Sequence, residues 1–66
     1  MIEVRLTPEK VKRFDHEVHI ANWVMSQLKA AGVPMVGVLF PRVESGTLTV
    51  TYDEFDTGDW IYRWRE

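Results

Sequence analysis

The stretch TPEKVKRFDHEVHIANWVMSQLKAAG, residues 7–32, decides the fold of this 66-residue chain. It predicts one long amphipathic helix over residues 8–31. Thr7 is a favoured N-cap residue, and Pro8 is favoured at the first helical position. Gly32 suits the residue that follows a helix, and the proline two residues later prevents its continuation.

This predicted helix carries two apolar stripes. The first has the alternating spacing of three and four residues that is typical of a helix packed on a sheet. The second lies beyond its edge, and a helix that covers one sheet face does not need it. We therefore predict that the second stripe binds a partner; the alternative is a curled sheet or a loop that makes it peripheral core. The first stripe is Val11, Phe14, Val18, Ala21, Met25 and Leu28, and the predicted partner-binding residues are Ile20, Trp23 and Val24 with His19 and Gln27.

Four strands are predicted around the helix. Apolar and polar residues alternate in residues 2–6, 47–53 and 60–65, which is typical of half-buried strands, while the apolar run 35–40 predicts a strand covered on both faces. The fold class is α+β, in the order β-α-β-β-β, with one long helix packed on one face of a small, mostly antiparallel sheet. A right-handed crossover would place the first strand beside a parallel neighbour. Residues 1–66 are predicted to be a single domain.

The composition limits both the fold and the function. A chain of this length buries only about 60% of the surface that its unfolded form exposes, so self-association is one expected source of stability. There are no cysteines, which excludes disulfides and thiolate zinc sites, and the net charge of −2 argues against strong non-specific nucleic-acid binding. No apolar run could span a membrane and no signal peptide is recognisable, so we expect a cytoplasmic protein.

Histidines and carboxylates on the helix form the first candidate for chemistry. Asp15 and His19 share one helix face, and His16 and Glu17 lie between them. Such pairs bind divalent metals in di-iron bundles, but those sites take ligands from several helices. We therefore expect a surface role, with His19 stacked on Trp23, and no bound metal.

A polar turn near the C-terminus holds the second candidate. Its four carboxylates fall within seven residues, a density that suits Ca²⁺ or Mg²⁺. The EF-hand pattern is not met, so we interpret the turn as solvated, and a surface for a basic partner is the next reading. These residues are Asp53, Glu54, Asp56 and Asp59.

Aromatic and arginine residues alternate in the last predicted strand. Aromatic side chains and arginines on a sheet surface can bind single-stranded nucleic acid. Alternation, however, places the aromatic residues and the arginines on opposite faces, and we expect the aromatic face to be core. Nucleic-acid binding is kept as the alternative, through Trp60, Tyr62, Trp64, Arg63 and Arg65.

The sequence favours a small non-enzymatic protein–protein interaction module. It has no nucleophile-elbow pattern and no glycine-rich phosphate loop, so we expect no catalytic residue and no cofactor. The expected partner is a second copy of the chain, a larger protein, or both, bound through the helix face around Trp23. A chain of this size suits an accessory or inhibitory factor, for example of a phage or mobile element.

Overall fold

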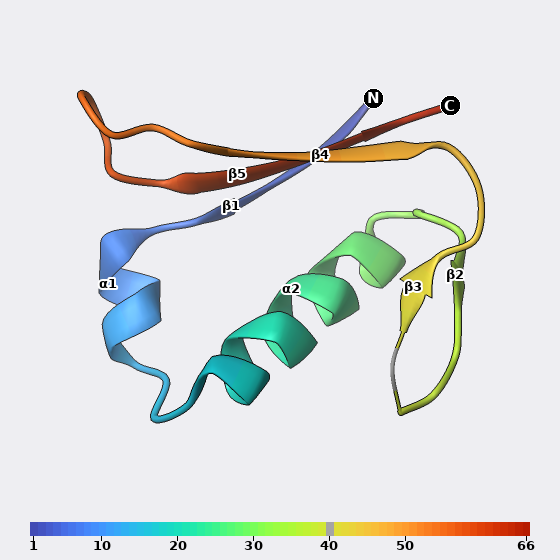
Figure 1. The fold of residues 1–66 in the computed structure, drawn as a ribbon, viewed down its shortest axis with the longest axis horizontal. Coiled ribbons are helices and arrows are strands. Elements are labelled where there is room, and N and C mark those ends of the chain that lie inside the picture. Colours follow the sequence, from blue (N-terminus) through green and yellow to red (C-terminus); the bar gives the residue numbers. More distant parts are fainter. Residues whose placement is uncertain (40) are drawn as a thin grey trace.

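Three antiparallel strands form the main sheet of the computed structural model, which describes residues 1–39 and 41–66 (Figure 1). The strand order is β1 (Ile2–Leu6), β5 (Trp60–Arg65) and β4 (Thr47–Tyr52), with β5 in the centre. The register pairs the start of β1 with the end of β5, so the two ends of the chain lie side by side. The alternating sequence pattern located all three strands, with an error of one residue at the end of β4.

A second, two-stranded antiparallel sheet joins the helical part of the chain to β4. It consists of β2 (Met35–Val36) and β3 (Arg42–Val43). The predicted strand 35–40 is thus reduced to its first two residues, and Phe40 lies outside the described residues. β3 lies between the predicted strands 35–40 and 47–53, in a segment for which no strand was predicted.

The connection between β1 and the rest of the sheet differs from the predicted crossover. β1 pairs with β5 in the antiparallel direction and has no parallel neighbour among the described strands. The chain leaves β1, runs through the helices on one side of the sheet, and returns to β1 only with its last strand. Of the helices in the described residues, none combines the length and apolar character needed to cross a membrane.

The prediction of one long helix is wrong, because the structure has two. α1 (Pro8–Lys12) has Thr7 as its N-cap, and α2 (Glu17–Ala30) begins after a break. His16 in this break is extended, and its Nδ1 accepts the N–H of Val18 at 3.2 Å, which caps α2. One helix over residues 8–31 would be about 36 Å long. The longest extent of the molecule is 30 Å, so the break lets the chain fold back under the sheet.

The break also changes which face of the helix is buried. Val24 and Leu28 are 1% and 0% exposed, whereas Val18 of the predicted core stripe is 57% exposed. α2 therefore packs on the sheet through residues of both predicted stripes, Leu28 of the first and Val24 of the second. The buried core cluster is Leu6, Val24, Leu28, Val33 and Trp64.

A close approach at Gly46 fixes the start of β4 against the core. Gly46 has φ +82°, and a Cβ atom there would lie 2.6 Å from the carbonyl oxygen of Arg65. The indole of Trp64 donates a 2.8 Å hydrogen bond to the carbonyl of Ser45 beside it. A side chain is therefore excluded at Gly46 both by conformation and by space.

A buried and an exposed residue of the predicted first stripe can be compared by matched substitutions. Leu28→Ala should lower the free energy of unfolding by about 2–5 kcal/mol, because it leaves a cavity at a fully buried site. Val18→Ala removes a mostly exposed side chain and should change the free energy of unfolding by less than about 0.5 kcal/mol. Urea unfolding followed by circular dichroism measures both values, and an equal effect of the two substitutions would contradict the observed packing.

Candidate functional site

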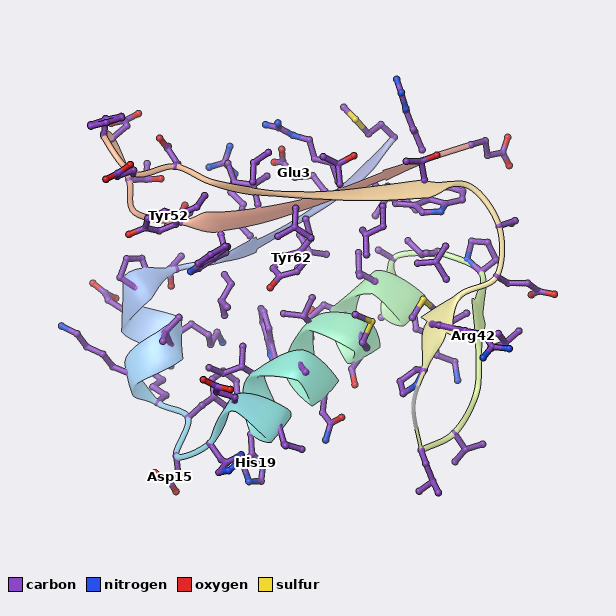
Figure 2. The ribbon with its side chains drawn as sticks, in the orientation of Figure 1. Glu3, Asp15, His19, Arg42, Tyr52 and Tyr62 are labelled. Atoms are coloured by element: carbon purple, nitrogen blue, oxygen red, sulfur yellow. The ribbon has the colours of Figure 1, made fainter. Side chains whose placement is uncertain are left out.

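Exposure increases across the inner face of the main sheet, the face that α2 covers. In one row of paired residues, Leu6 of β1 is 2% exposed, Trp60 of β5 is 42% exposed and Tyr52 of β4 is 50% exposed. In the next row, Tyr62 of β5 is half-buried and points toward α2 (Figure 2), while Val50 of β4 is 46% exposed. The helices therefore cover the β1 side of the sheet and leave the β4 side uncovered at Val50 and Tyr52, while Leu48 at the start of β4 packs on the core.

Val50, Tyr52 and Trp60 form an apolar patch on this uncovered side, which we call the sheet patch. The rings of Tyr52 and Trp60 stack, with centroids 4.7 Å apart and an interplanar angle of 29°. Aromatic side chains that remain exposed on a small domain are typical of interaction surfaces, since they supply large apolar area with little loss of side-chain entropy. The sheet patch is therefore a candidate docking surface.

The outer edge of β4 adds unpaired backbone groups beside the sheet patch. The N–H of Asp53 donates to the carbonyl of Asp59 at 2.9 Å, and hydrogen-bonded pairs alternate in an antiparallel ladder. Thr47, Thr49 and Thr51 therefore direct their backbone groups toward β5. The backbone groups of Leu48, Val50 and Tyr52 face away from β5. Within residues 1–39 and 41–66, the carbonyl of Tyr52 is the only one of these groups with a backbone partner, the N–H of Glu54 at 3.1 Å.

The two edges of the main sheet differ in charge. β1 carries Glu3 and Arg5, and charged residues on an edge strand oppose the addition of another strand. β4, with the sequence TLTVTY, has no charged residue, no proline and no glycine. It is therefore an edge strand without the usual protection against strand addition.

The predicted partner-binding face of α2 is largely occupied by the chain itself. Val24 lies in the core, which removes its side chain from the surface. Ile20 and Trp23 are half-buried, and the Trp23 ring has Phe14 at 6.3 Å between ring centroids and the Lys10 Nζ at 4.9 Å from its centroid. His19 and Gln27 are exposed. Partner binding by this face stays a prediction, and it would use a smaller surface than the sequence indicated.

The outer face of the sheet carries a charged network. The Glu3 carboxylate accepts hydrogen bonds from Arg63 at 2.9 Å and from Arg5 at 3.2 Å, and Arg5 also reaches Asp59 at 3.4 Å. The hydrogen bonds from Arg63 and Arg5 lower the pKa of Glu3, and those from Glu3 and Asp59 raise the pKa of Arg5. The network links β1 to β5 on the side away from the core, and a structural role accounts for it.

The acidic turn is partly internal structure. Asp53 accepts hydrogen bonds from the backbone and hydroxyl of Thr57, and Asp59 is 8% exposed beside Arg5. Glu54 and Asp56 are exposed. In residues 1–39 and 41–66 no three histidines, cysteines or carboxylates gather closely enough to hold a metal ion, and this applies to the turn and to the Asp15 region.

The aromatic residues of β5 are divided between core and surface. Trp64 is 8% exposed and Tyr62 is half-buried, whereas Trp60 belongs to the sheet patch. Arg63 lies on the opposite face and contacts Glu3. The residues of the nucleic-acid alternative are thus not brought together on one surface.

Val50 and Tyr52 are the residues that the sequence reasoning did not select. Alternation placed them on the inner face, but their exposure follows from β4 lying at the edge of the sheet. The signal available in the sequence is the uncharged run TLTVTY.

Comparison of the chain with protein-family models, with curated proteins and with solved structures gave no match.

The charged network should make stability depend on pH. Glu3→Gln removes its ion pairs and should lower the urea midpoint at neutral pH. The folded-state pKa of Glu3 is lowered. The carboxylate therefore contributes fully to the stability of the fold above the unfolded-state pKa of about 4.3, and this contribution is lost as the pH falls through the folded-state pKa. The difference between wild type and variant should therefore shrink toward acid pH. A difference that stays constant would contradict a role of the carboxylate charge.

Trp23 can be tested as a core or an interface residue. Trp23→Asp should destabilise the fold by about 2 kcal/mol or more, because the ring packs against Phe14 and the core cluster. Thermal unfolding and sedimentation of the same samples separate the two roles. Unchanged thermal stability together with loss of association would assign Trp23 to an interface instead.

Proposed function

We propose that this chain is a non-catalytic protein-interaction module that accepts another polypeptide strand at the free edge of β4. The observation that carries the proposal is the combination, on one strand, of unpaired backbone groups and exposed apolar side chains. Strand addition uses both: backbone hydrogen bonds supply affinity, and alternate side chains supply specificity.

Two other surfaces have less support. The helix face around Trp23 has lost Val24 to the core, and Trp23 itself packs against Phe14. For single-stranded nucleic acid, Trp64 is too buried to stack on a base, and Arg63 is engaged by Glu3 on the other face. The β4 edge needs no rearrangement of the fold in order to bind.

Site-specific photo-crosslinking tests the module and compares its surfaces. A photoreactive phenylalanine analogue is introduced at Tyr52, beside the free edge, and in a matched variant at Gln27, on the helix face around Trp23. The experiment is carried out in cells of the organism that encodes the chain. We expect a discrete covalent adduct with another polypeptide from position 52 and none from position 27.

A second substitution shows whether such an adduct depends on the edge. Val50→Pro removes an N–H that faces away from β5 at a residue that is 46% exposed, so the fold should tolerate it while strand addition is blocked. The adduct at position 52 should then disappear, with unchanged circular dichroism of the variant. Adducts that persist in the Val50→Pro background, or that form only from position 27, would overturn the proposed edge.

A further inference from the structure

We infer that the strand added to β4 is β4 of a second copy of this chain, so that two three-stranded sheets join into one of six strands. This inference rests on the function proposed above and names its partner. Val50 lies on the two-fold axis and pairs with Val50 of the second copy. Leu48 of each copy pairs with Tyr52 of the other.

Backbone geometry selects this register. A symmetric contact brings the same surface of both copies together, so residues equally far from the axis along β4 become partners. The groups that face the free edge belong to Leu48, Val50 and Tyr52, and an axis at Val50 makes all of them hydrogen-bonded positions. An axis at Thr49 or Thr51 also pairs free-edge groups with one another, but it leaves Tyr52 or Leu48, respectively, without a partner inside β4. An axis at Val50 pairs all three free-edge residues within the strand and therefore forms the largest number of hydrogen bonds.

The side chains agree with the same register. On the inner face, Val50 meets its own copy and Leu48 meets Tyr52, which continues the sheet patch across the junction. On the outer face, Thr49 lies opposite Thr51. Aliphatic, aromatic and threonine pairs of this kind stabilise neighbouring strands.

Charges near the junction are complementary. β4 itself is uncharged, so two copies do not repel each other along it. One position beyond the paired residues, Thr47 lies opposite Asp53 of the second copy, and Arg65 is the neighbour of Thr47 on β5. Arg65 and Asp53 of the second copy then stand two strand spacings apart, about 10 Å, within the range over which charges interact at moderate salt. The symmetry provides this favourable pair twice.

The isolated chain exposes more surface than a compact monomer of its mass. A mass of 7.8 kDa corresponds to about 4,400 Å² of accessible surface. The chain exposes 5093 Å², about 700 Å² more, and its radius of gyration of 12.0 Å exceeds the roughly 11 Å of a compact chain of this length. A standard interface buries about 800 Å² on each partner. The excess is thus of the size that one dimer interface would cover.

The second copy also supplies a cover for the sheet patch. In the antiparallel pairing, the Thr47 end of β4 in the second copy lies beside the Tyr52 end of β4 in the first copy. Its β2–β3 hairpin precedes Thr47 and lies on the same side of the sheet as α2 (Figure 1). The turn of this hairpin carries Val38 and Leu39, which are 94% and 83% exposed. These side chains come to the end of the sheet where Tyr52 and Trp60 are exposed.

Opposite charges at position 50 test the axis directly. Wild type should sediment as a dimer, with dissociation on dilution through the micromolar range. Val50→Lys and Val50→Glu each place like charges on the axis, so each variant should be a monomer with wild-type circular dichroism and thermal stability near that of the wild-type monomer. An equimolar mixture of the two should recover a dimer, because only residue 50 faces itself.

Single cysteines test the register in a chain that has none of its own. Val50→Cys should form a disulfide-linked dimer under mild oxidation, because paired Cα atoms on the axis lie about 5.5 Å apart. Leu48→Cys and Tyr52→Cys are matched controls, because each residue lies about 14 Å from its own copy. Neither should cross-link alone by this route, whereas a mixture of the two should give the mixed disulfide.

The outcomes separate this inference from the proposed function. A wild type that remains a monomer up to about 0.5 mM would overturn the second copy as the partner. The module would still stand if the crosslink at Tyr52 captured a different polypeptide in an edge-dependent manner. A dimer that Val50→Lys leaves intact, or cross-linking of Leu48→Cys faster than Val50→Cys, would also overturn the inference.

Discussion

The packing of α2 against β1 and β5 is the contact on which the rest of the structure depends. Leu28 and Val24 meet Leu6 and Trp64 there, and nearly all fully buried side chains belong to this cluster. A helix is about 10–12 Å in diameter and neighbouring strands are about 4.8 Å apart, so one helix covers two strands well. The Val50–Tyr52 part of the third strand, β4, is left without a cover. The surface available for binding is therefore a geometric result of pairing one helix with three strands.

The uncovered strand differs from the rest of the surface in chemistry as well as in position. Where β1 forms an edge, it is charged and its outer face is tied to β5 by Glu3 and Arg63. β4 has only threonines on one face and apolar side chains on the other. Threonine keeps the strand soluble without introducing charge, and its β-branched side chain favours the extended conformation. This combination keeps β4 ordered at the edge while leaving its backbone groups free for another strand.

The strands of the main sheet could be predicted because alternation is a local property of β1, β4 and β5. The break before α2 could not be predicted in this way, because the helix ends at residues 13–16 as a result of tertiary packing and not of a local sequence pattern. Phe14 packs on Trp23 of α2, and one continuous helix of about 36 Å would be longer than the 30 Å extent of the molecule. With the break in place, Val18 of the predicted first stripe is exposed, and Val24 of the predicted second stripe joins Leu28 in the core. The exposure of Tyr52 could likewise not be predicted, because it depends on the order of the strands in the sheet, and a short stretch of sequence does not determine that order.

The central position of β5 has a consequence for how the chain folds. β5 pairs with β1 across 54 to 62 positions of sequence, from Leu6 with Trp60 to Ile2 with Trp64. During synthesis β1 and β4 both emerge before the only strand that joins them, so no part of the main ladder can form early. Contacts of such long range slow folding relative to helical domains of the same size. During that delay the uncharged β4 is available to neighbouring nascent chains, so the rate at which the sheet closes governs whether encounters between chains are orderly or lead to aggregation.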